Sequence, residues 1–579
     1  MKRQWLKPHY RSTLPLFYAL QSLMAALCLL DALQVPYHAT ILRGVSKYKF
    51  SLGLDLTPAL LTLSIISLAY LAYQRKTRAI LISILVSAGF YLLFGLNVST
   101  AVFAMLVVVS TVLSQKFLHD YLFWTLALLS GLEGAAFLYW VLPVGTFPMR
   151  WLANLEHGLY GVIANPAPLI TILALFMWFI KSIVKIRIRG GTSPRIDLDS
   201  SDKEIHLNPK ILLALSLVLA VAGALYPYRP DINPESVPVG VDITLYLNWT
   251  ESVEQDPSLI FTISGSRPMI LLIIIALKHL LGWEFQEVIR SLPVLLNPLL
   301  SLSVFLMVSL ASGDKEWASL SSLLTALGFN TSIGMYSYFL TNNLGLILIF
   351  PAIGFLFKNL TEEKYSYTAA ASALASLAVF THPWTFTQFY ATIGLFGLIL
   401  GYRYLNKNRR NGLFTILIFL AVTGVVDVLK GILIGGEGLS AFSSTAPLHL
   451  NFIYFWDNNK FTFRHLYGGY LSNSVLIGFA ALGIYFLKRE KTYHYFLEIL
   501  LAVSSIYFLV ALCAVRMRPY IYIPARLMYN IPFGVLSALA VLILLRKTEL
   551  RKRDKMMVLT FFILYMAVYL FRSLANLVY

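Results

Sequence analysis

The chain is poor in charge. Only 13% of its 579 residues are Asp, Glu, Lys or Arg, whereas 58% are hydrophobic, and the mean hydropathy is +0.71. A soluble protein of this length could not hide so much apolar surface from water. The sequence also lacks the alternating apolar and polar pattern that is typical of membrane β-barrels. These absences favour a bundle of membrane-spanning α-helices, which satisfy their backbone hydrogen bonds within each segment.

Cysteine is nearly absent as well. The two cysteines, Cys28 and Cys513, both lie in or beside apolar segments. They have no metal-ligand spacing, and their positions do not favour a disulfide. The first apolar stretch is followed by Asp31 and Gln34 without a small-residue cleavage site. We therefore expect a retained helix there instead of a cleaved signal peptide.

Apolar segments long enough to cross a bilayer recur along the whole chain. We predict an all-α fold, a polytopic transmembrane bundle of about 17 spans. The predicted spans are residues 15–33, 57–73, 79–96, 99–114, 120–142, 167–183, 210–226, 288–310, 316–331, 342–358, 367–382, 386–402, 412–431, 471–487, 495–514, 530–546 and 556–576.

The basic residues predict the orientation of these spans. With the N-terminus in the cytoplasm, most of the 46 Lys and Arg residues fall in cytoplasmic loops, as the positive-inside rule requires. The net charge of +18 is then a topological bias and gives no reason to expect nucleic acid as a partner. We predict a multi-pass protein of the cell membrane, in contact with membrane lipids, with a cytoplasmic N-terminus and an extracytoplasmic active site.

A polar stretch predicts the division of the chain. Residues 1–183 read as an N-terminal six-span membrane module, residues 184–209 as a cytoplasmic polar linker, and residues 210–579 as a membrane core with long external loops. No internal repeat is evident, which disfavours transporters built from inverted repeats.

The predicted external loops hold the residues of chemical interest. Asp242 lies in the first loop of the core, and Arg267 opens the apolar run 268–282, which we expect to be an interfacial helix. Arg516 and Arg526 also fall outside, against the positive-inside bias. Guanidinium groups bind phosphate bidentately, so the group favours an anion site. Snorkelling to lipid headgroups, or pairing with acidic residues of 231–256, is the alternative.

Five short motifs follow one another in this half of the chain. They are Gly240-Val241-Asp242-Ile243-Thr244-Leu245-Tyr246, Arg267-Pro268, Leu281-Gly282-Trp283-Glu284-Phe285, Arg290-Ser291-Leu292-Pro293 and Arg526-Leu527-Met528-Tyr529-Asn530. In this order and on one predicted side, they resemble the membrane-embedded C-type glycosyltransferases, which use polyprenyl-phosphate sugars. The resemblance covers about residues 210–546, and it leaves residues 1–200 unmatched.

The resemblance implies roles for the external residues. Asp242 would be the catalytic general base, and Arg526, Arg267 and Arg516 would bind the donor phosphate. Substrate-binding roles would fall to His382, Trp384, Tyr246, Asn342 and Tyr529. An aromatic belt anchor is the alternative for the Trp and Tyr residues, and a structural role is the alternative for the histidine.

The sequence also departs from that family. Many members carry a second acidic residue after the third core span, where this chain has Asn342-Asn343. The Trp-Trp-Asp signature of metal-dependent oligosaccharyltransferases is missing too, so a divalent metal is not indicated and no cofactor is predicted. Asp231 and Asp256 are the reserve candidates for the base, although solvated loop charges are the simpler interpretation.

The resemblance implies an inverting glycosyltransferase that moves a sugar from a polyprenyl-phosphate donor to a glycan, lipid or protein acceptor. The alternative is a lipid-linked glycan polymerase, ligase or flippase. A flippase would need charges along a route through the membrane, for which Asp427 and Glu133 are the clear acidic candidates. A non-enzymatic scaffold in a surface-glycan complex is a third hypothesis.

Overall fold

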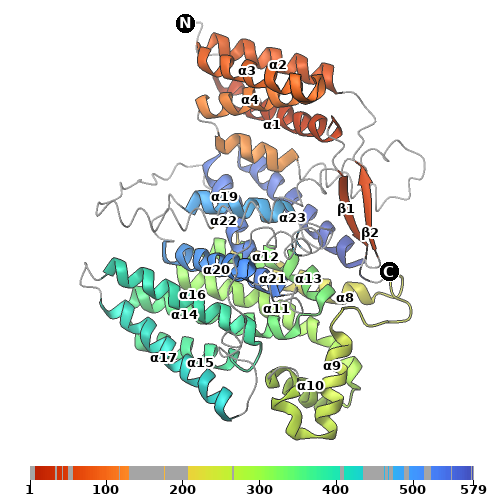
Figure 1. The fold of residues 1–579 in the computed structure, drawn as a ribbon, viewed down its shortest axis with the longest axis vertical. Helices are drawn as coiled ribbons and strands as arrows, with labels where there is room; N and C mark the ends of the chain where they lie inside the picture. The colour runs from red at the N-terminus through yellow and green to blue at the C-terminus, as the bar shows by residue number, and fades with distance from the viewer. Residues whose placement is uncertain are drawn as a thin grey trace. The chain divides into compact units, whose positions relative to one another are not determined.

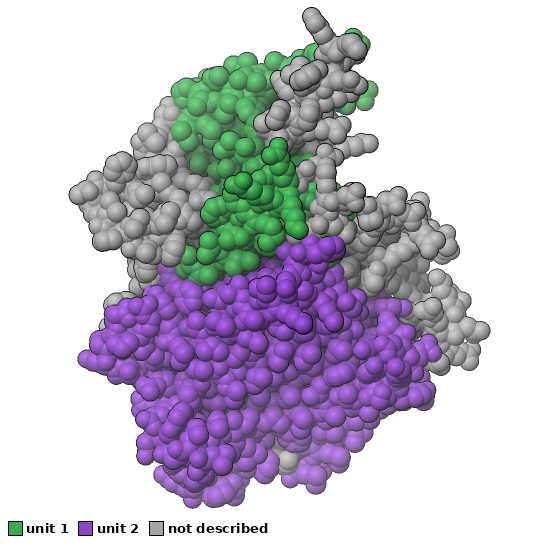
Figure 2. Space-filling model, turned by 180° about the vertical axis from the view of Figure 1, so that it is seen from behind, with its two compact units in different colours: residues 1–163, 198–205, 542–568 green, residues 164–197, 206–541, 569–579 purple. Residues whose placement is uncertain are grey.

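The chain forms two compact units, and the computed structural model describes part of the residues of each. The described residues are 7–32, 36–41, 44–49, 56–115, 118–128, 175, 206–263, 267–404, 410–433, 462, 467, 474–487, 494–513, 523–548, 551–575 and 577. Unit 1 comprises residues 1–163, 198–205 and 542–568, and unit 2 comprises residues 164–197, 206–541 and 569–579 (Figure 2). The predicted division at 184–209 stays a prediction, since residues 184–205 lie outside the described part of the chain.

Unit 1 is built from apolar helices and one hairpin (Figure 1). Its elements are α1 (Lys7–Ala32), β1 (Pro36–Ile41), β2 (Gly44–Lys49), α2 (Thr57–Tyr73), α3 (Thr77–Phe94) and α4 (Leu96–Gln115). The helices α1, α2 and α3 all pack on α4, and the two strands pair antiparallel. Buried Gln21 of α1 accepts a hydrogen bond from Ser67 at 2.7 Å and donates one to Ser64 at 3.2 Å. Such polar links hold apolar helices together where water cannot compete.

Unit 2 holds the remaining helices, except residues 542–547 of α22 and residues 552–568 of α23, which belong to unit 1. Its elements are α8 (Pro209–Leu225), η1 (Tyr226–Tyr228), α9 (Ile243–Gln255), η2 (Pro257–Phe261), α10 (Pro268–Leu281), α11 (Phe285–Ser312), α12 (Lys315–Ala326), α13 (Phe329–Ser337), α14 (Leu340–Glu362), α15 (Tyr365–Ala378), α16 (Pro383–Tyr404), α17 (Arg410–Leu433), α19 (Ser474–Leu487), α20 (His494–Cys513), α21 (Ile523–Tyr529), α22 (Phe533–Lys547) and α23 (Lys552–Ala575).

Eight helices among the described residues are long and apolar enough to cross a membrane. They are Thr77–Phe94, Pro209–Tyr228, Phe285–Ser312, Leu340–Glu362, Pro383–Gly401, Gly412–Leu433, Pro524–Lys547 and Lys552–Ala575. This composition is compatible with a multi-pass membrane protein of helical fold. The number of about 17 spans stays a prediction, and the predicted span 167–183 lies outside the described residues but for Leu175.

Two of the predicted spans are interrupted. The segment predicted as one span over 316–331 forms α12 and α13, which meet at Gly328, where a Cβ atom would lie 2.6 Å from the carbonyl oxygen of Leu324. The segment 530–546 begins outside α22, because α21 ends at Tyr529 and Pro532 precedes the next helix. Proline has no amide hydrogen to donate and therefore favours such a break.

Helix α14 is the centre of unit 2. It packs against α10, α11, α15, α16 and α17, and 83% of its most apolar window is buried (Figure 1). Side chains from the neighbouring helices fill this core. Several buried polar side chains are hydrogen-bonded, whereas Nδ2 of Asn297 and Oδ1 of Asn359 have no partner among the described residues. The indole of Trp317, which is fully buried, donates a hydrogen bond of 2.9 Å to the carbonyl oxygen of Val535.

The short helices α9 and α10 form a pair at one end of α11 (Figure 1). At 1.5 Å per residue the 14 residues of α10 span roughly 21 Å, which is too short to cross a bilayer. Ile270, Leu271 and Ile274 of α10 are buried, whereas Leu272 and Leu280 are exposed. A short helix therefore forms within the segment 268–282, and its position in the membrane interface stays a prediction.

Candidate functional site

Asp242 precedes α9 as its N-cap residue, but its side chain does not cap the helix. An aspartate at this position usually accepts a hydrogen bond from the amides of the first turn. Here the carboxylate Oδ2 atom lies 3.2 Å from Nη2 of Arg526, a residue 284 positions later in α21. The carboxylate of Asp242 therefore contacts Arg526 and does not cap helix α9.

The loop before Asp242 is held by contacts that only glycine allows. Gly240 has φ of +131°, and a Cβ atom there would lie 2.5 Å from the ring of Tyr338. The amide of Val241 donates a hydrogen bond of 2.9 Å to the carbonyl oxygen of Tyr336. These contacts fix the backbone beside Asp242 against the end of α13, which makes the position of the carboxylate reproducible.

Two guanidinium groups lie near this carboxylate. Arg526 is partly buried, and its guanidinium carbon lies 5.3 Å from the ring centroid of Phe339. Arg267 precedes α10 and lies 5.9 Å from the ring centroid of Trp249. The amide of Met269 donates to the carbonyl oxygen of Phe380, which ties the start of α10 to the turn before α16. Elements far apart in sequence therefore bring both arginines to one place.

The surroundings of Asp242 change its protonation behaviour. Burial raises the pKa of the Asp242 carboxyl group above its usual range, and the positive charges of Arg526 and Arg267 oppose that rise without cancelling it. A carboxylate with a raised pKa is a better proton acceptor than a solvated one, and a general base works best when its pKa approaches the working pH. Its electrostatics therefore suit Asp242 for the predicted base role.

His382 occupies the turn before α16 and is fully buried. Its Nδ1 atom accepts a hydrogen bond of 3.2 Å from the amide of Thr385, so the ring proton resides on Nε2. Burial holds the pKa of His382 well below its usual range, and the charges of Arg267, Arg526 and Lys430 lower it further. Among the described residues no partner accepts a bond from Nε2. The ring is neutral and carries a buried donor that a ligand could satisfy.

A buried amide network continues from Thr385. The side chain of Asn342 donates to the hydroxyl of Thr385 at 3.0 Å, and Asn530 donates to Gln388 at 2.8 Å. Gln388 in turn donates to the carbonyl oxygen of Leu527 at 3.0 Å. The predicted substrate residue Asn342 is 1% exposed and is used to join α14 to α16.

Tyr529 belongs to an adjoining cluster. Its hydroxyl lies 2.6 Å from the carbonyl oxygen of Asn330 and 2.5 Å from the side-chain oxygen of Asn343, and the residue is fully buried. The pair Asn342-Asn343, where the family would place an acidic residue, thus supports the packing of α14 against α16 and α21. These contacts give the two asparagines a structural role in joining α14 to α16 and α21.

The remaining predicted site residues differ in their placement. Tyr246 is buried between Trp249 and Tyr338, and its hydroxyl lies 3.3 Å from that of Thr341. Trp384 is 9% exposed in the first turn of α16. Stacking of either ring on a sugar stays a prediction. The predicted phosphate-binding Arg516 lies outside the described residues.

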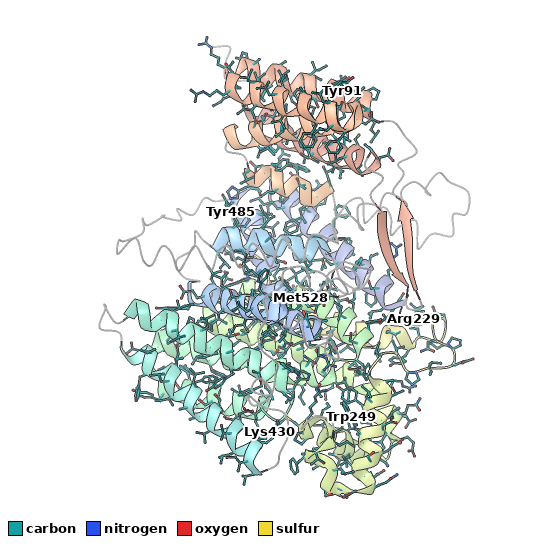
Figure 3. The ribbon with its side chains drawn as sticks, viewed as in Figure 1. Tyr91, Arg229, Trp249, Lys430, Tyr485 and Met528 are labelled. Carbon is teal, nitrogen blue, oxygen red and sulfur yellow. The ribbon has the colours of Figure 1, made fainter. Side chains whose placement is uncertain are left out.

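Sequence reasoning missed Lys430. It lies in the last turn of α17, is 4% exposed, and its ammonium group donates a hydrogen bond of 2.8 Å to the carbonyl oxygen of Val379. Figure 3 labels it at the end of α17. The signal that could have revealed it is its spacing from Asp427, because residues three apart share one face of a helix and two charges in an apolar span are rare.

A mostly apolar pocket adjoins the amide network. It lies between α11, α14, α16 and α20, and its cavity volume is about 30 Å³. Thr385, Gln388 and Asn530 contribute its polar wall, and they are the same side chains that link His382 to α21. Its lining is mostly apolar, as is typical of sites for apolar ligands.

The described residues contain no group of three or more His, Cys, Asp or Glu side chains that could hold a metal ion. A scan against protein-family models and a search of curated proteins match nothing to this chain. The inference of function therefore rests on the residues and their geometry.

Proposed function

We propose that the protein is an inverting glycosyltransferase that moves a sugar from a polyprenyl-phosphate donor to a glycan, lipid or protein acceptor. One observation supports this above the others. A partly buried carboxylate, Asp242, lies beside Arg526 and Arg267 at one end of an apolar helical bundle. A base next to an anion-binding group is what transfer from a lipid phosphate requires.

Each charged group has its own role in the proposed reaction. The carboxylate of Asp242 accepts the proton of the acceptor hydroxyl as that oxygen attacks the anomeric carbon of the sugar. The bond from the anomeric carbon to the phosphate oxygen breaks at the same time, and its electron pair stays with the phosphate. A single displacement of this kind inverts the anomeric centre.

The leaving phosphate needs cations because negative charge grows on it during bond cleavage. Arg526 and Arg267 would supply them, and their guanidinium groups remain charged at any working pH. The neutral His382 adds a buried N–H donor. The apolar pocket beside Thr385 has the lining to accommodate hydrocarbon.

We further propose that this chemistry takes place on the extracytoplasmic face of the cell membrane, with the N-terminus in the cytoplasm. The excess of basic residues in alternate loops supports this orientation. Cysteine labelling from each side of intact cells, with single cysteines placed at exposed Glu251 and at Arg75, tests it directly. Labelling of both positions from the same side would refute it.

The function itself is tested with the full-length protein in lipid vesicles. A panel of radiolabelled polyprenyl-phosphate sugars is incubated with membrane acceptors, and sugar transfer is measured. Transfer from at least one donor, lost in the Asp242→Asn variant, supports the proposal. Movement of the lipid-linked sugar across the vesicle membrane without transfer would support a flippase instead.

The alternative of a lipid-linked glycan polymerase, ligase or flippase is favoured by one observation. Asp427 and Lys430 are both buried within the apolar span Gly412–Leu433. Charges inside a span mark ion and substrate pathways in transporters. A flippase would keep moving lipid when Asp242 is replaced by Asn, whereas a transferase would lose its activity.

A further inference from the structure

A chain of buried side chains leads from the backbone beside Arg526 to His382. Its first hydrogen bond is fixed in direction, because the carbonyl oxygen of Leu527 can only accept. Nε2 of Gln388 lies 3.0 Å from that oxygen and is therefore the donor. The other atom of the Gln388 amide is then its oxygen, which accepts from Nδ2 of Asn530 at 2.8 Å. Each bond in the chain thus determines the direction of the next.

The chain continues to the hydroxyl group of Thr385. The Asn530 amide has a second N–H, and its Nδ2 atom lies 3.3 Å from Oγ1 of Thr385. Nδ2 of Asn342 lies 3.0 Å from the same hydroxyl oxygen and 3.5 Å from Oδ1 of Asn530, which would repel an oxygen atom in that place. The hydroxyl group therefore accepts two hydrogen bonds and keeps one hydrogen atom to donate.

The acceptor of that hydrogen atom is the ring of His382. Nδ1 of His382 lies 3.1 Å from the hydroxyl oxygen of Thr385, and the backbone amide of Thr385 donates to the same nitrogen at 3.2 Å. Two donors at Nδ1 orient the ring and keep its proton on Nε2. Among the described residues Nε2 has no hydrogen-bond partner, although it is buried. Such a donor costs free energy until a ligand atom accepts its hydrogen.

This N–H group and the guanidinium group of Arg526 belong to one site. His382 interacts electrostatically with Arg526, and Nε of Arg526 is likewise buried without a partner in the described part of the chain. The chain of hydrogen bonds ends at Leu527, the residue after Arg526, so it ties the position of one donor to that of the other. The oxygens of a phosphate group can accept from both donors.

We propose that Thr385 is a positioning residue, which holds His382 as a fixed N–H donor to an oxygen of the lipid-linked phosphate. This deepens the proposed function and rests on its phosphate donor. The direction of the chain gives a reason for the amide of Asn342, where the resembling family has an acidic residue. An ionised carboxylate can only accept, so it would take the hydrogen atom of Thr385 and leave His382 with the backbone amide alone.

Binding of fluorescent polyprenyl monophosphate to the full chain in lipid nanodiscs tests this. Thr385→Val keeps the volume of the side chain and removes its hydroxyl group. It should weaken binding about 10-fold, because Nε2 of His382 is no longer held toward the phosphate. Thr385→Ser restores the hydroxyl group and should bind within about threefold of the wild type.

Thr423→Val is the matched control and should bind as the wild type does. This buried threonine of α17 donates its hydroxyl hydrogen to the carbonyl oxygen of Phe419 in its own helix at 2.8 Å. Equal losses in Thr423→Val and Thr385→Val, or unchanged binding by Thr385→Val, would overturn the inference.

A double-mutant cycle separates positioning from a general structural defect. His382→Phe removes both ring nitrogens and should itself weaken binding about 10-fold. Adding Thr385→Val to His382→Phe should weaken binding by less than about twofold more, because Thr385 acts through the ring that is already lost. Losses that multiply as independent effects would contradict the positioning role.

Two further probes establish which part of the ligand is recognised. Polyprenyl alcohol of the same chain length should bind the wild type and Thr385→Val equally, although Thr385 also borders the apolar pocket. Weaker binding of the alcohol by Thr385→Val would place the defect in the pocket and overturn the inference. Inorganic phosphate that displaces the probe as well as unlabelled polyprenyl phosphate does would overturn the assignment to a lipid-linked phosphate.

The results also distinguish this inference from the proposed function. Phosphate binding that depends on Thr385 and His382, without sugar transfer by the wild type, would refute the transferase and leave the positioning role intact. Sugar transfer by the wild type together with unchanged phosphate binding by Thr385→Val would refute the positioning role and leave the transferase intact.

Discussion

Replacing Asp242 by Asn keeps the shape of the side chain and removes its ability to accept a proton. General-base catalysis contributes about 10²- to 10⁴-fold to a rate, so the variant should lose that factor, or about 2.7–5.5 kcal/mol of transition-state stabilisation. The loss should appear in the maximal rate of sugar transfer, because Arg526 and Arg267 still bind the donor.

The structure also gives the expected effect on stability. At 3.2 Å the attraction between Asp242 and Arg526 is about 5 kcal/mol for an effective dielectric constant of about 20. The pKa of Asp242 is nevertheless raised, so the cost of burying its charge exceeds that attraction. The folded chain therefore holds this proton more tightly than the unfolded chain. Protonated Asp242 therefore stabilises the folded chain at pH values below the pKa that its carboxyl group has in the unfolded chain. This stabilisation is lost as the pH rises through the pKa of Asp242 in the folded chain.

The neutral amide of the Asn variant imitates the protonated carboxyl group and can still accept a bond from Arg526. We expect its free energy of unfolding at neutral pH to stay within about 2 kcal/mol of the wild-type value. The assay combines initial rates of transfer in vesicles with thermal unfolding in detergent, and Asp231→Asn is the control, since Asp231 forms an exposed pair with Arg229. Wild-type turnover by the Asp242→Asn protein would refute the assignment of the base.

Three other perturbations test the site. Arg526→Ala should raise the KM for the donor about 10- to 100-fold and leave the KM for the acceptor unchanged, because charge-assisted hydrogen bonds to phosphate are lost; equal effects on both would contradict the phosphate role. The transfer rate should fall as the pH drops through the raised pKa of Asp242, and a flat profile from neutral to acidic pH would count against that carboxylate as the base. Gly240→Ala should lower the free energy of unfolding by about 2–6 kcal/mol, since a Cβ atom meets Tyr338 at a positive φ. Gly282→Ala has a positive φ but open space around it and should cost only about 1–2 kcal/mol in the same unfolding measurement; equal costs would show that the contact with Tyr338 is unimportant.

Periodicity and hydropathy predict much of the fold because a helix in a membrane needs only a long apolar run. The predicted span 57–73 coincides with α2 (Thr57–Tyr73), and 210–226 differs from α8 (Pro209–Leu225) by one residue at each end. The break at Gly328 was missed, because it depends on how closely a neighbouring carbonyl oxygen approaches, and that distance is set by packing.

The chemistry of the site could be predicted from residue types but its geometry could not. The sequence marks Asp242 and Arg526 as unusual, yet no local rule brings together residues 284 positions apart. Lys430 was missed because a lysine near the end of an apolar helix usually snorkels to the interface. Its side chain instead turns inward to Val379, a choice made by the tertiary packing of α17 on α15.

Helix α14 is central in unit 2, but it is synthesised before several of the helices that surround it. This helix leaves the ribosome before α16, α17 and α20 have been synthesised, although α16 and α17 pack against it in the finished bundle. Asn342 and Asn343 are therefore synthesised before Thr385 and Tyr529, their hydrogen-bond partners, exist. In a membrane-spanning α14 these amides would lack partners in hydrocarbon, which is unfavourable, until the later helices pack against it. A chain that stops short of α16 should consequently be recognised as unfinished and degraded.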